Sequence, residues 1–126
     1  MSCKLCEKEG GTLLWRDDFC RVVRPAVDGY PGFLRVIVNR HVKEMTDLEE
    51  RARLMRVVFA CESALLQLYK PDKVNLASLG NVVPHVHWHV IARFAEDVRK
   101  RGGDVVIVAL TPGQSTTAIV EKLRGK

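Results

Sequence analysis

The chain has 126 residues, 47% of them hydrophobic and 28% charged, with a formal net charge of +5 at pH 7. This length and composition favour a single globular domain over residues 1–126. The sequence contains neither an apolar stretch of about 18 residues nor an apolar signal core, which argues against a membrane protein and favours the cytoplasm. Lysine and arginine are scattered without interleaved aromatic residues, so an anionic small molecule is a better expected partner than nucleic acid.

The first part of the chain predicts three strands. Short β-branched or aromatic runs at residues 12–15 and 19–24, separated by three polar residues, predict a hairpin. A glycine-rich loop at residues 28–32 precedes a third, strongly β-prone run, Phe33–Val38.

A long amphipathic helix is predicted over residues 47–69. The segment Thr46-Asp47-Leu48-Glu49 has the S/T-x-x-E pattern of a capping box. Behind it, apolar residues recur at helical spacing: Leu54, Val58, Cys61, Leu65 and Leu68. Pro71 should end the helix, because proline disfavours the helical conformation of the residue before it.

The second half of the chain predicts two more strands. Residues 73–78 form one, a loop around Gly80 follows, and a histidine-bearing strand runs from His85 to about Phe94. An apolar run at residues 105–110 would add a strand edge, and residues 115–123 predict a short C-terminal helix. Antiparallel strands with one long helix indicate an α+β fold.

Three of the four histidines, His85, His87 and His89, alternate with apolar residues. Alternate side chains of a strand share a face, so we expect all three imidazoles on one side of the sheet. Clustered histidines are typical of a metal site or a catalytic site. A straight strand places the Cα atoms of His85 and His89 about 13 Å apart, which disfavours one tetrahedral zinc bound by all three. Separate roles are favoured, with His87 facing an open substrate site.

The run His85-Val86-His87-Trp88-His89-Val90-Ile91 resembles the His-φ-His-φ-His-φ-φ signature of the histidine triad (HIT) family, where φ is apolar. The resemblance continues upstream through residues 30–41 and 75–81, is strongest over residues 3–94 and is weak over residues 95–126. It implies a five-stranded antiparallel sheet with a long helix, a homodimer and a purine nucleotide or nucleotide conjugate as partner. It further implies a nucleotide hydrolase or transferase in which His87 attacks the α-phosphorus and His89 donates a hydrogen bond to developing charge.

The resemblance also implies substrate-binding residues. The loop that carries Asn75, Gly80 and Asn81 would contact phosphates, although an apolar residue replaces the usual hydroxyl after Asn81. For both asparagines, turn geometry is an equal explanation. Phe33 stands where many members carry a further histidine and would form a wall of the base pocket. Asp28 is the nearest acidic residue for the ribose.

The cysteines predict a metal site. Cys3 and Cys6 form a C-x-x-C motif, and a tetrahedral structural zinc requires two further ligands. His41 and His85 are the candidates, because some bacterial HIT proteins and galactose-1-phosphate uridylyltransferases use this combination. The alternative is that the cysteines belong to a frayed terminus and that His41 merely caps a strand.

Together these features predict a hydrolase that releases a nucleoside monophosphate from a dinucleoside polyphosphate, a nucleoside phosphoramidate or a similar conjugate through a covalent nucleotidyl-histidine. Two alternatives remain at this point. In the first, the triad binds a catalytic zinc that activates water. In the second, the protein is a nucleotide-binding module without catalytic activity.

Overall fold

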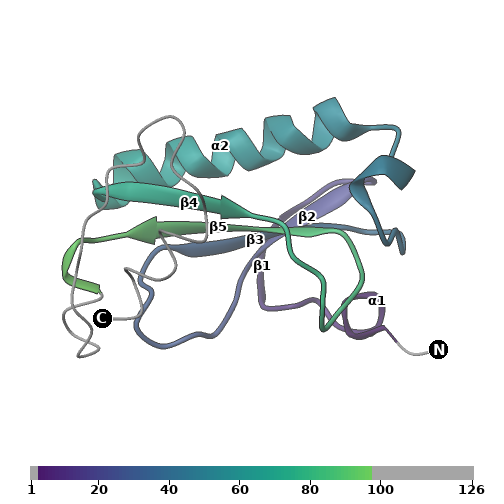
Figure 1. Cartoon of the computed structure of the whole chain (residues 1–126), viewed down its shortest axis with the longest axis horizontal. Coiled ribbons are helices and arrows are strands. Elements are labelled where there is room, and N and C mark those ends of the chain that lie inside the picture. Colours follow the sequence, from purple (N-terminus) through teal and green to yellow (C-terminus); the bar gives the residue numbers. More distant parts are fainter. Residues whose placement is uncertain (1–2, 98–126) are drawn as a thin grey trace, which may run out of the picture. The chain divides into compact units, whose positions relative to one another are not determined.

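A computed structural model describes residues 3–97 and contains a five-stranded antiparallel sheet with a long helix on one face (Figure 1). The sheet order is β1-β2-β3-β5-β4. The strands are β1 Thr12–Arg16, β2 Cys20–Arg24, β3 Phe33–Val38, β4 Lys73–Ala77 and β5 His87–Arg93. All four neighbouring pairs are antiparallel, which confirms the predicted α+β fold.

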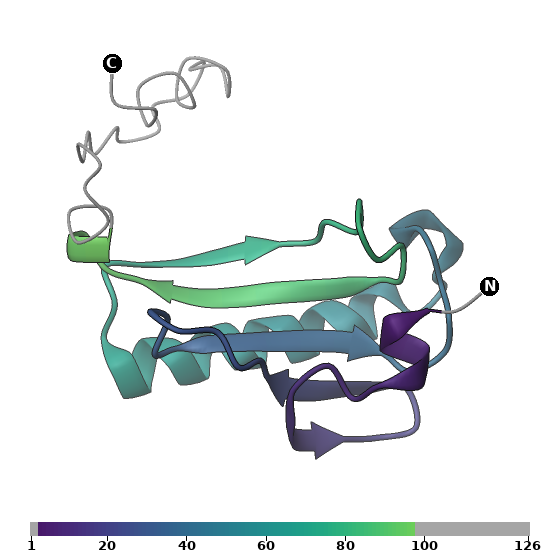
Figure 2. The same cartoon turned by 90° about the horizontal axis from the view of Figure 1, so that it is seen from below.

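Helix α2, Arg51–Tyr69, covers one face of the sheet through a buried apolar stripe formed by Leu54, Val58, Cys61 and Leu65. Leu68 was expected to extend this stripe, but it is 76% exposed, because the last turn of the helix turns that position away from the sheet. The helix ends as predicted before Pro71, and Lys70 adopts a left-handed conformation with φ of 47°. The short helix α1, Lys4–Glu7, lies on the opposite face of the sheet (Figure 2).

The start of the long helix differs from the prediction. Helix α2 begins at Arg51, four residues later than expected, and a 3₁₀ helix, η1 Met45–Asp47, precedes it. The capping box is formed by Glu44 and Asp47, whose carboxylates each accept the other's backbone N–H. These two residues have the same spacing as the predicted pair, Thr46 and Glu49, but lie two positions earlier.

Strand β5 begins at His87, so His85 lies outside it and the prediction of one strand through all three histidines is wrong. The backbone leaves the strand pattern at this point: the His85 N–H donates to the Val83 carbonyl at 2.8 Å, and the Val86 N–H donates to the Val42 carbonyl at 2.7 Å. From His87 onward the register with β3 is regular, with Ile37 opposite His87. His85 is therefore free to point to a different place from the other two histidines.

Contacts divide the chain into two units, residues 1–93 and 94–126. The described part of the second unit contains a turn, in which the Asp97 N–H donates to the Phe94 carbonyl at 2.9 Å. The predicted strand at residues 105–110 and helix at residues 115–123 lie outside the described residues, and the single-domain boundary stays a prediction. Within residues 3–97, neither helix has the length and apolar character that a membrane crossing requires.

Candidate active site and metal centre

A cavity of about 250 Å³ lies on the α1 side of the sheet, between β3, β5 and the loop that follows β4. Four residues that the sequence proposed for the site line it: Gly80, Asn81, His87 and His89. Gly80 has φ of +123°, a conformation that favours glycine and shapes the loop over the cavity. The cavity is the candidate active site.

His87 is held in one tautomer by its own chain. Its Nδ1 lies 2.6 Å from the His85 carbonyl oxygen, which can only accept, so Nδ1 carries the proton and Nε2 carries the free electron pair. Burial lowers the pKa of His87, the hydrogen bond to His85 opposes this shift, and the Arg35 cation adds to it. His87 is therefore a neutral imidazole at physiological pH, which suits a nucleophile.

His89 lies beside His87, with ring centroids 5.1 Å apart. Burial, and after it the charges of Arg35 and His87, lower the pKa of His89 to about 4. The Phe33 ring contacts His89 edge-on at 5.4 Å between centroids and is itself 8% exposed. Phe33 thus packs against His89 and is not among the residues that line the cavity.

The other two predicted substrate residues lie away from the cavity lining. Asn75 is part of β4 and not of a loop, and its side-chain oxygen accepts a hydrogen bond from Arg93 Nη1 at 3.2 Å. In register, Asn75 lies opposite Ile91, so it shares the face of the sheet that carries the histidines. Asp28 is exposed in the loop before β3.

Sequence reasoning did not propose the other residues of the cavity lining, Leu5, Arg35, Leu79, Val82 and Val83, of which Leu5 and Arg35 lie outside the loop after β4. Arg35 lies in the middle of β3 directly opposite His89, so both side chains project from the same face of the sheet. The period-two pattern of β3 placed Arg35 on the same side as Phe33 and could have revealed it. No sequence pattern indicated that Leu5, on the N-terminal helix, would reach this site.

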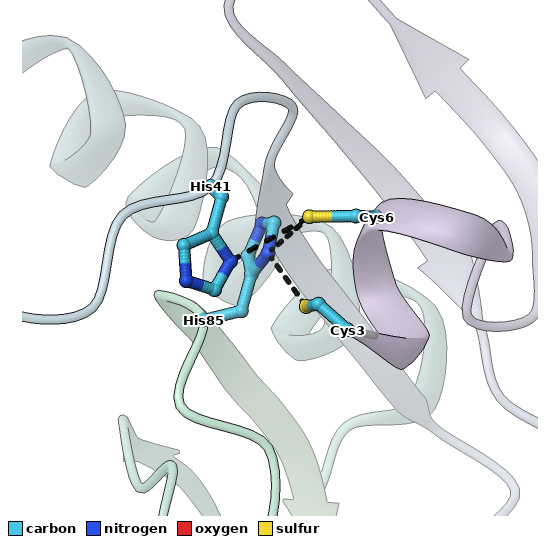
Figure 3. A group of neighbouring side chains, drawn as sticks. All are labelled: Cys3, Cys6, His41 and His85. Carbon is cyan, nitrogen blue, oxygen red and sulfur yellow. Dashed lines mark hydrogen bonds between the residues drawn. The ribbon is translucent and has the colours of Figure 1, made fainter. Parts of the chain in front are cut away.

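His85 belongs to a different cluster, which consists of Cys3, Cys6, His41 and His85 (Figure 3). One donor atom from each residue lies within 4.8 Å of the others. His85 Nδ1 is 3.3 Å from Cys3 Sγ and 3.4 Å from Cys6 Sγ, and His41 Nδ1 is 3.5 Å from Cys6 Sγ. The structure thus brings together the four residues that the sequence proposed as metal ligands.

The donor set fits a tetrahedral zinc. Bond lengths of about 2.3 Å to sulfur and 2.0 to 2.1 Å to nitrogen place neighbouring donors about 3.5 Å apart, close to the distances in this cluster. His85 is also in the correct tautomer, because Nε2 donates to the Val38 carbonyl at 2.6 Å and leaves the Nδ1 electron pair free toward the thiols. Four protein donors leave no open position, which is typical of structural zinc sites.

Two arginines fasten the N-terminal segment to the sheet next to both sites. Arg21, which is 4% exposed, donates from Nη2 to the Leu5 carbonyl at 2.6 Å and from Nε to the Glu9 carbonyl at 3.0 Å. Arg35 donates from Nη1 to the Gly10 carbonyl at 3.1 Å. The segment that carries Cys3 and Cys6 therefore also supplies a wall of the candidate active site.

The HIT domain family model matches residues 8–96. The chain belongs to the HIT family. This family has a nucleotide-binding, generally hydrolase or transferase type of function, and some of its members are not catalytic. No curated protein matches the chain in sequence.

Solved structures of HIT proteins share the fold. A histidine triad protein from Bradyrhizobium japonicum is 27% identical with a TM-score of 0.64, and the match covers 91% of this chain and 87% of that one. A histidine triad protein from Sinorhizobium meliloti is 21% identical with a TM-score of 0.68, covering 98% and 91%. The Caenorhabditis elegans NitFhit protein is 22% identical with a TM-score of 0.62, covering 89% of this chain and 26% of that longer one.

Proposed function

We propose that this HIT protein hydrolyses nucleotide conjugates at the α-phosphate through a covalent nucleotidyl-histidine on His87. The observation that carries the proposal is the state of His87. Its Nδ1–H is bound to the His85 carbonyl at 2.6 Å and its pKa is lowered by burial, so Nε2 offers an electron pair without prior deprotonation.

The proposed reaction has two steps. In the first, His87 Nε2 forms a bond to the α-phosphorus, and the bond from phosphorus to the leaving group breaks with its electron pair on that group. In the second, water attacks the phosphorus, the N–P bond breaks, and a nucleoside monophosphate is released. His89, whose ring lies beside that of His87, donates its N–H to the charge that develops in each step.

The substrate belongs to the dinucleoside polyphosphates, nucleoside phosphoramidates or similar purine nucleotide conjugates. Gly80 and Asn81 line the cavity and would contact its phosphates. Asn75, on the histidine face of β4, and Asp28, in the loop before β3, are proposed to bind more distant parts of the substrate. Phe33 would support the base pocket from behind His89. We further propose that the protein is a homodimer and acts in the cytoplasm.

Zinc at the cysteine–histidine cluster is proposed as a structural ion. It would be bound by Cys3, Cys6, His41 and His85 and would supply a rigid link between three segments of the chain. His85 would then have two roles: its backbone carbonyl orients the His87 ring, and its own ring binds the ion.

Incubation with a panel of α-phosphate-linked nucleotides, followed by analysis of nucleoside monophosphate release, tests the activity. We expect an acid-labile, base-stable adduct on His87 with α-phosphate-labelled substrate, and a loss of turnover by several orders of magnitude in His87→Asn. The Glu62→Gln variant, which alters a half-buried residue of α2 outside the cavity lining, should retain full turnover. More than a tenth of wild-type turnover in His87→Asn would remove His87 from the nucleophile role.

The same panel separates the two alternatives. A chiral α-phosphorothioate should be hydrolysed with overall retention, because each of the two displacements inverts the phosphorus. Overall inversion would indicate direct attack by a metal-activated water, although His85 Nδ1 faces the two thiols rather than the other triad histidines. Tight nucleotide binding with no turnover of any conjugate would indicate a binding module.

A further inference from the structure

Arg35 is the one charged residue among the described residues that line the candidate active site. It lies opposite His89 in the pairing of β3 with β5, one strand away from the histidines and on the same face. Since arginine does not lose its proton in proteins, the cavity contains a permanent positive charge.

The hydrogen-bonding capacity of this guanidinium is largely unused. Nη1 donates to the Gly10 carbonyl at 3.1 Å, whereas Nε is buried without a hydrogen-bond partner. None of the ion pairs found among residues 3–97 includes Arg35. Arg35 is a half-buried cation without a counterion, and its buried Nε donor is unpaired. Such an arrangement destabilises the protein, so its presence points to an acceptor that arrives with a ligand.

Arg21 shows what a purely structural buried arginine looks like in the same sheet. Its Nε and Nη2 donate to carbonyl oxygens of the N-terminal segment, and Nη1 donates to Asn39 Oδ1 at 3.2 Å. A carboxylate oxygen of Glu9 lies 3.5 Å from its Nε. Every nitrogen of Arg21 has a partner and it lies outside the cavity lining, whereas Arg35 lines the cavity and does not have such a set.

We propose that Arg35 is an anion-binding residue of the candidate active site and that it holds a phosphate oxygen of the bound nucleotide conjugate beside His87. A guanidinium presents paired N–H donors that match the geometry of phosphate oxygens. That the anion is part of a nucleotide rests on the proposed function, but the binding of an anion does not.

The surroundings of Arg35 strengthen this assignment. Leu79 and Val82 line the same cavity and give its wall apolar surface, next to which an ionic hydrogen bond is stronger than in bulk water. Among the described residues that line the cavity, only Arg35 has a side chain that is charged throughout the physiological pH range. Arg35 is thus the cation on which phosphate recognition in this cavity depends.

Calorimetric titration with inorganic phosphate, with AMP and GMP, and with adenosine and guanosine tests the proposal. In Arg35→Met, the affinity for phosphate and for the better-bound monophosphate should fall by about 10- to 100-fold, as expected for a hydrogen bond to a charged group. The affinity for the corresponding nucleoside should not change. Arg35→Lys, which retains a cation and a donor for the Gly10 carbonyl, should have an intermediate affinity for the monophosphate.

Arg56→Met is the matched control. It removes one arginine from the exposed surface of α2, on the other face of the sheet, and should leave all affinities unchanged. Equal monophosphate affinity in Arg35→Met and the wild type would overturn the proposal. An equal loss of nucleoside and monophosphate affinity would also overturn it, because Arg35 would then only maintain the shape of the cavity.

The two proposals fail in different ways. If the wild type binds inorganic phosphate through Arg35 but no nucleotide, the proposed nucleotide hydrolase is wrong and the anion site stands. If nucleotides bind and are hydrolysed equally well in Arg35→Met, the hydrolase stands and the anion site is wrong.

Discussion

Protonation of His89 is controlled by two neighbours and by burial. The ring lies between the cation of Arg35 and the imidazole of His87, and burial is the largest cause of its low pKa, about 4. Across most of the physiological range His89 is therefore neutral. A neutral ring still provides one N–H, so His89 can act as a hydrogen-bond donor without carrying charge.

Removal of the Arg35 cation should raise the pKa of His89. In Arg35→Met the imidazolium no longer experiences repulsion from a guanidinium, so the pKa should move upward from about 4, while burial keeps it below the unperturbed value. At any pH between the wild-type pKa of about 4 and the higher pKa of the variant, a larger fraction of His89 is then protonated in Arg35→Met than in the wild type. NMR titration of the histidine ring protons measures this shift. An unchanged His89 titration in Arg35→Met, with the Arg56→Met protein as reference, would contradict the prediction.

At the scale of elements, helix α1 connects the two sites. It contains Cys6, follows Cys3 directly, and contributes Leu5 to the wall of the cavity. Four residues are too few for a stable isolated helix, so its conformation depends on docking to the sheet and on the cysteine–histidine cluster. Loss of the proposed metal should therefore change the conformation of the N-terminal segment first.

Replacement of one thiol should release the metal. Cys3→Ser removes one of four proposed ligands, so we expect bound zinc to fall below one equivalent and the melting temperature to fall, since a structural site couples metal binding to folding. Metal analysis of protein purified without added zinc, with thermal unfolding followed in parallel, makes the measurement. Cys61→Ala, which alters a buried thiol of α2 outside the cluster, should keep the full zinc content. Wild-type protein that is purified zinc-free, with an ordered N-terminal segment, would contradict the prediction.

The sequence predicted the strands well because each has a strong β-prone run between turn residues. It predicted the buried face of α2 down to Leu65 for a similar reason, the helical spacing of its apolar residues. It failed where a tertiary contact decided the outcome. His85 leaves the strand because its backbone and ring are held by Val83 and Val38, which no local pattern reveals. Helix α1 is too short to have a periodic signal.

In the candidate active site, the sequence analysis proposed His87 and His89 but did not propose the cation, Arg35. The alternating histidines and the C-x-x-C motif have recognisable spacing. The structure places His87 and His89 at the cavity and His85 in the cluster with His41 and the two cysteines. Arg35 was overlooked although the period-two pattern places it on the same face of the strand as Phe33, because that pattern alone does not say that β3 lies next to β5. Its functional meaning depends on the pairing of β3 with β5.

At the scale of the whole molecule, the sheet formed by residues 3–97 has two outer strands, β1 and β4, and the outer edge of each pairs with no other strand of these residues. Such edges offer backbone N–H and C=O groups for pairing. Helix α2 also exposes large apolar side chains, Phe59 at 51% and Leu66 at 46%. Both features favour association with a second chain, in agreement with the two-fold dimers that the family resemblance implies.

We therefore expect a homodimer in solution. Sedimentation equilibrium at micromolar concentration should give twice the 14.2 kDa mass of one chain. Phe59→Glu and Leu66→Glu, on the exposed side of α2, test whether that face takes part in the interface. The control variant Arg56→Met should have the same mass in solution as the wild type. A strictly monomeric wild type at these concentrations would contradict the prediction.

The order of the strands also governs how the chain acquires its structure. Strands β3 and β5 are neighbours in the sheet, yet β4 and all of α2 lie between them in sequence. Closing this long loop costs chain entropy before the pairing repays it, so β3–β5 pairing belongs to the slow, non-local part of folding. The hairpin of β1 and β2 and the turns of α2 form from local contacts and can precede it. Arg35, His87 and His89 consequently come together only when that central pairing closes, and a partly folded chain has its hairpin and helix but no site.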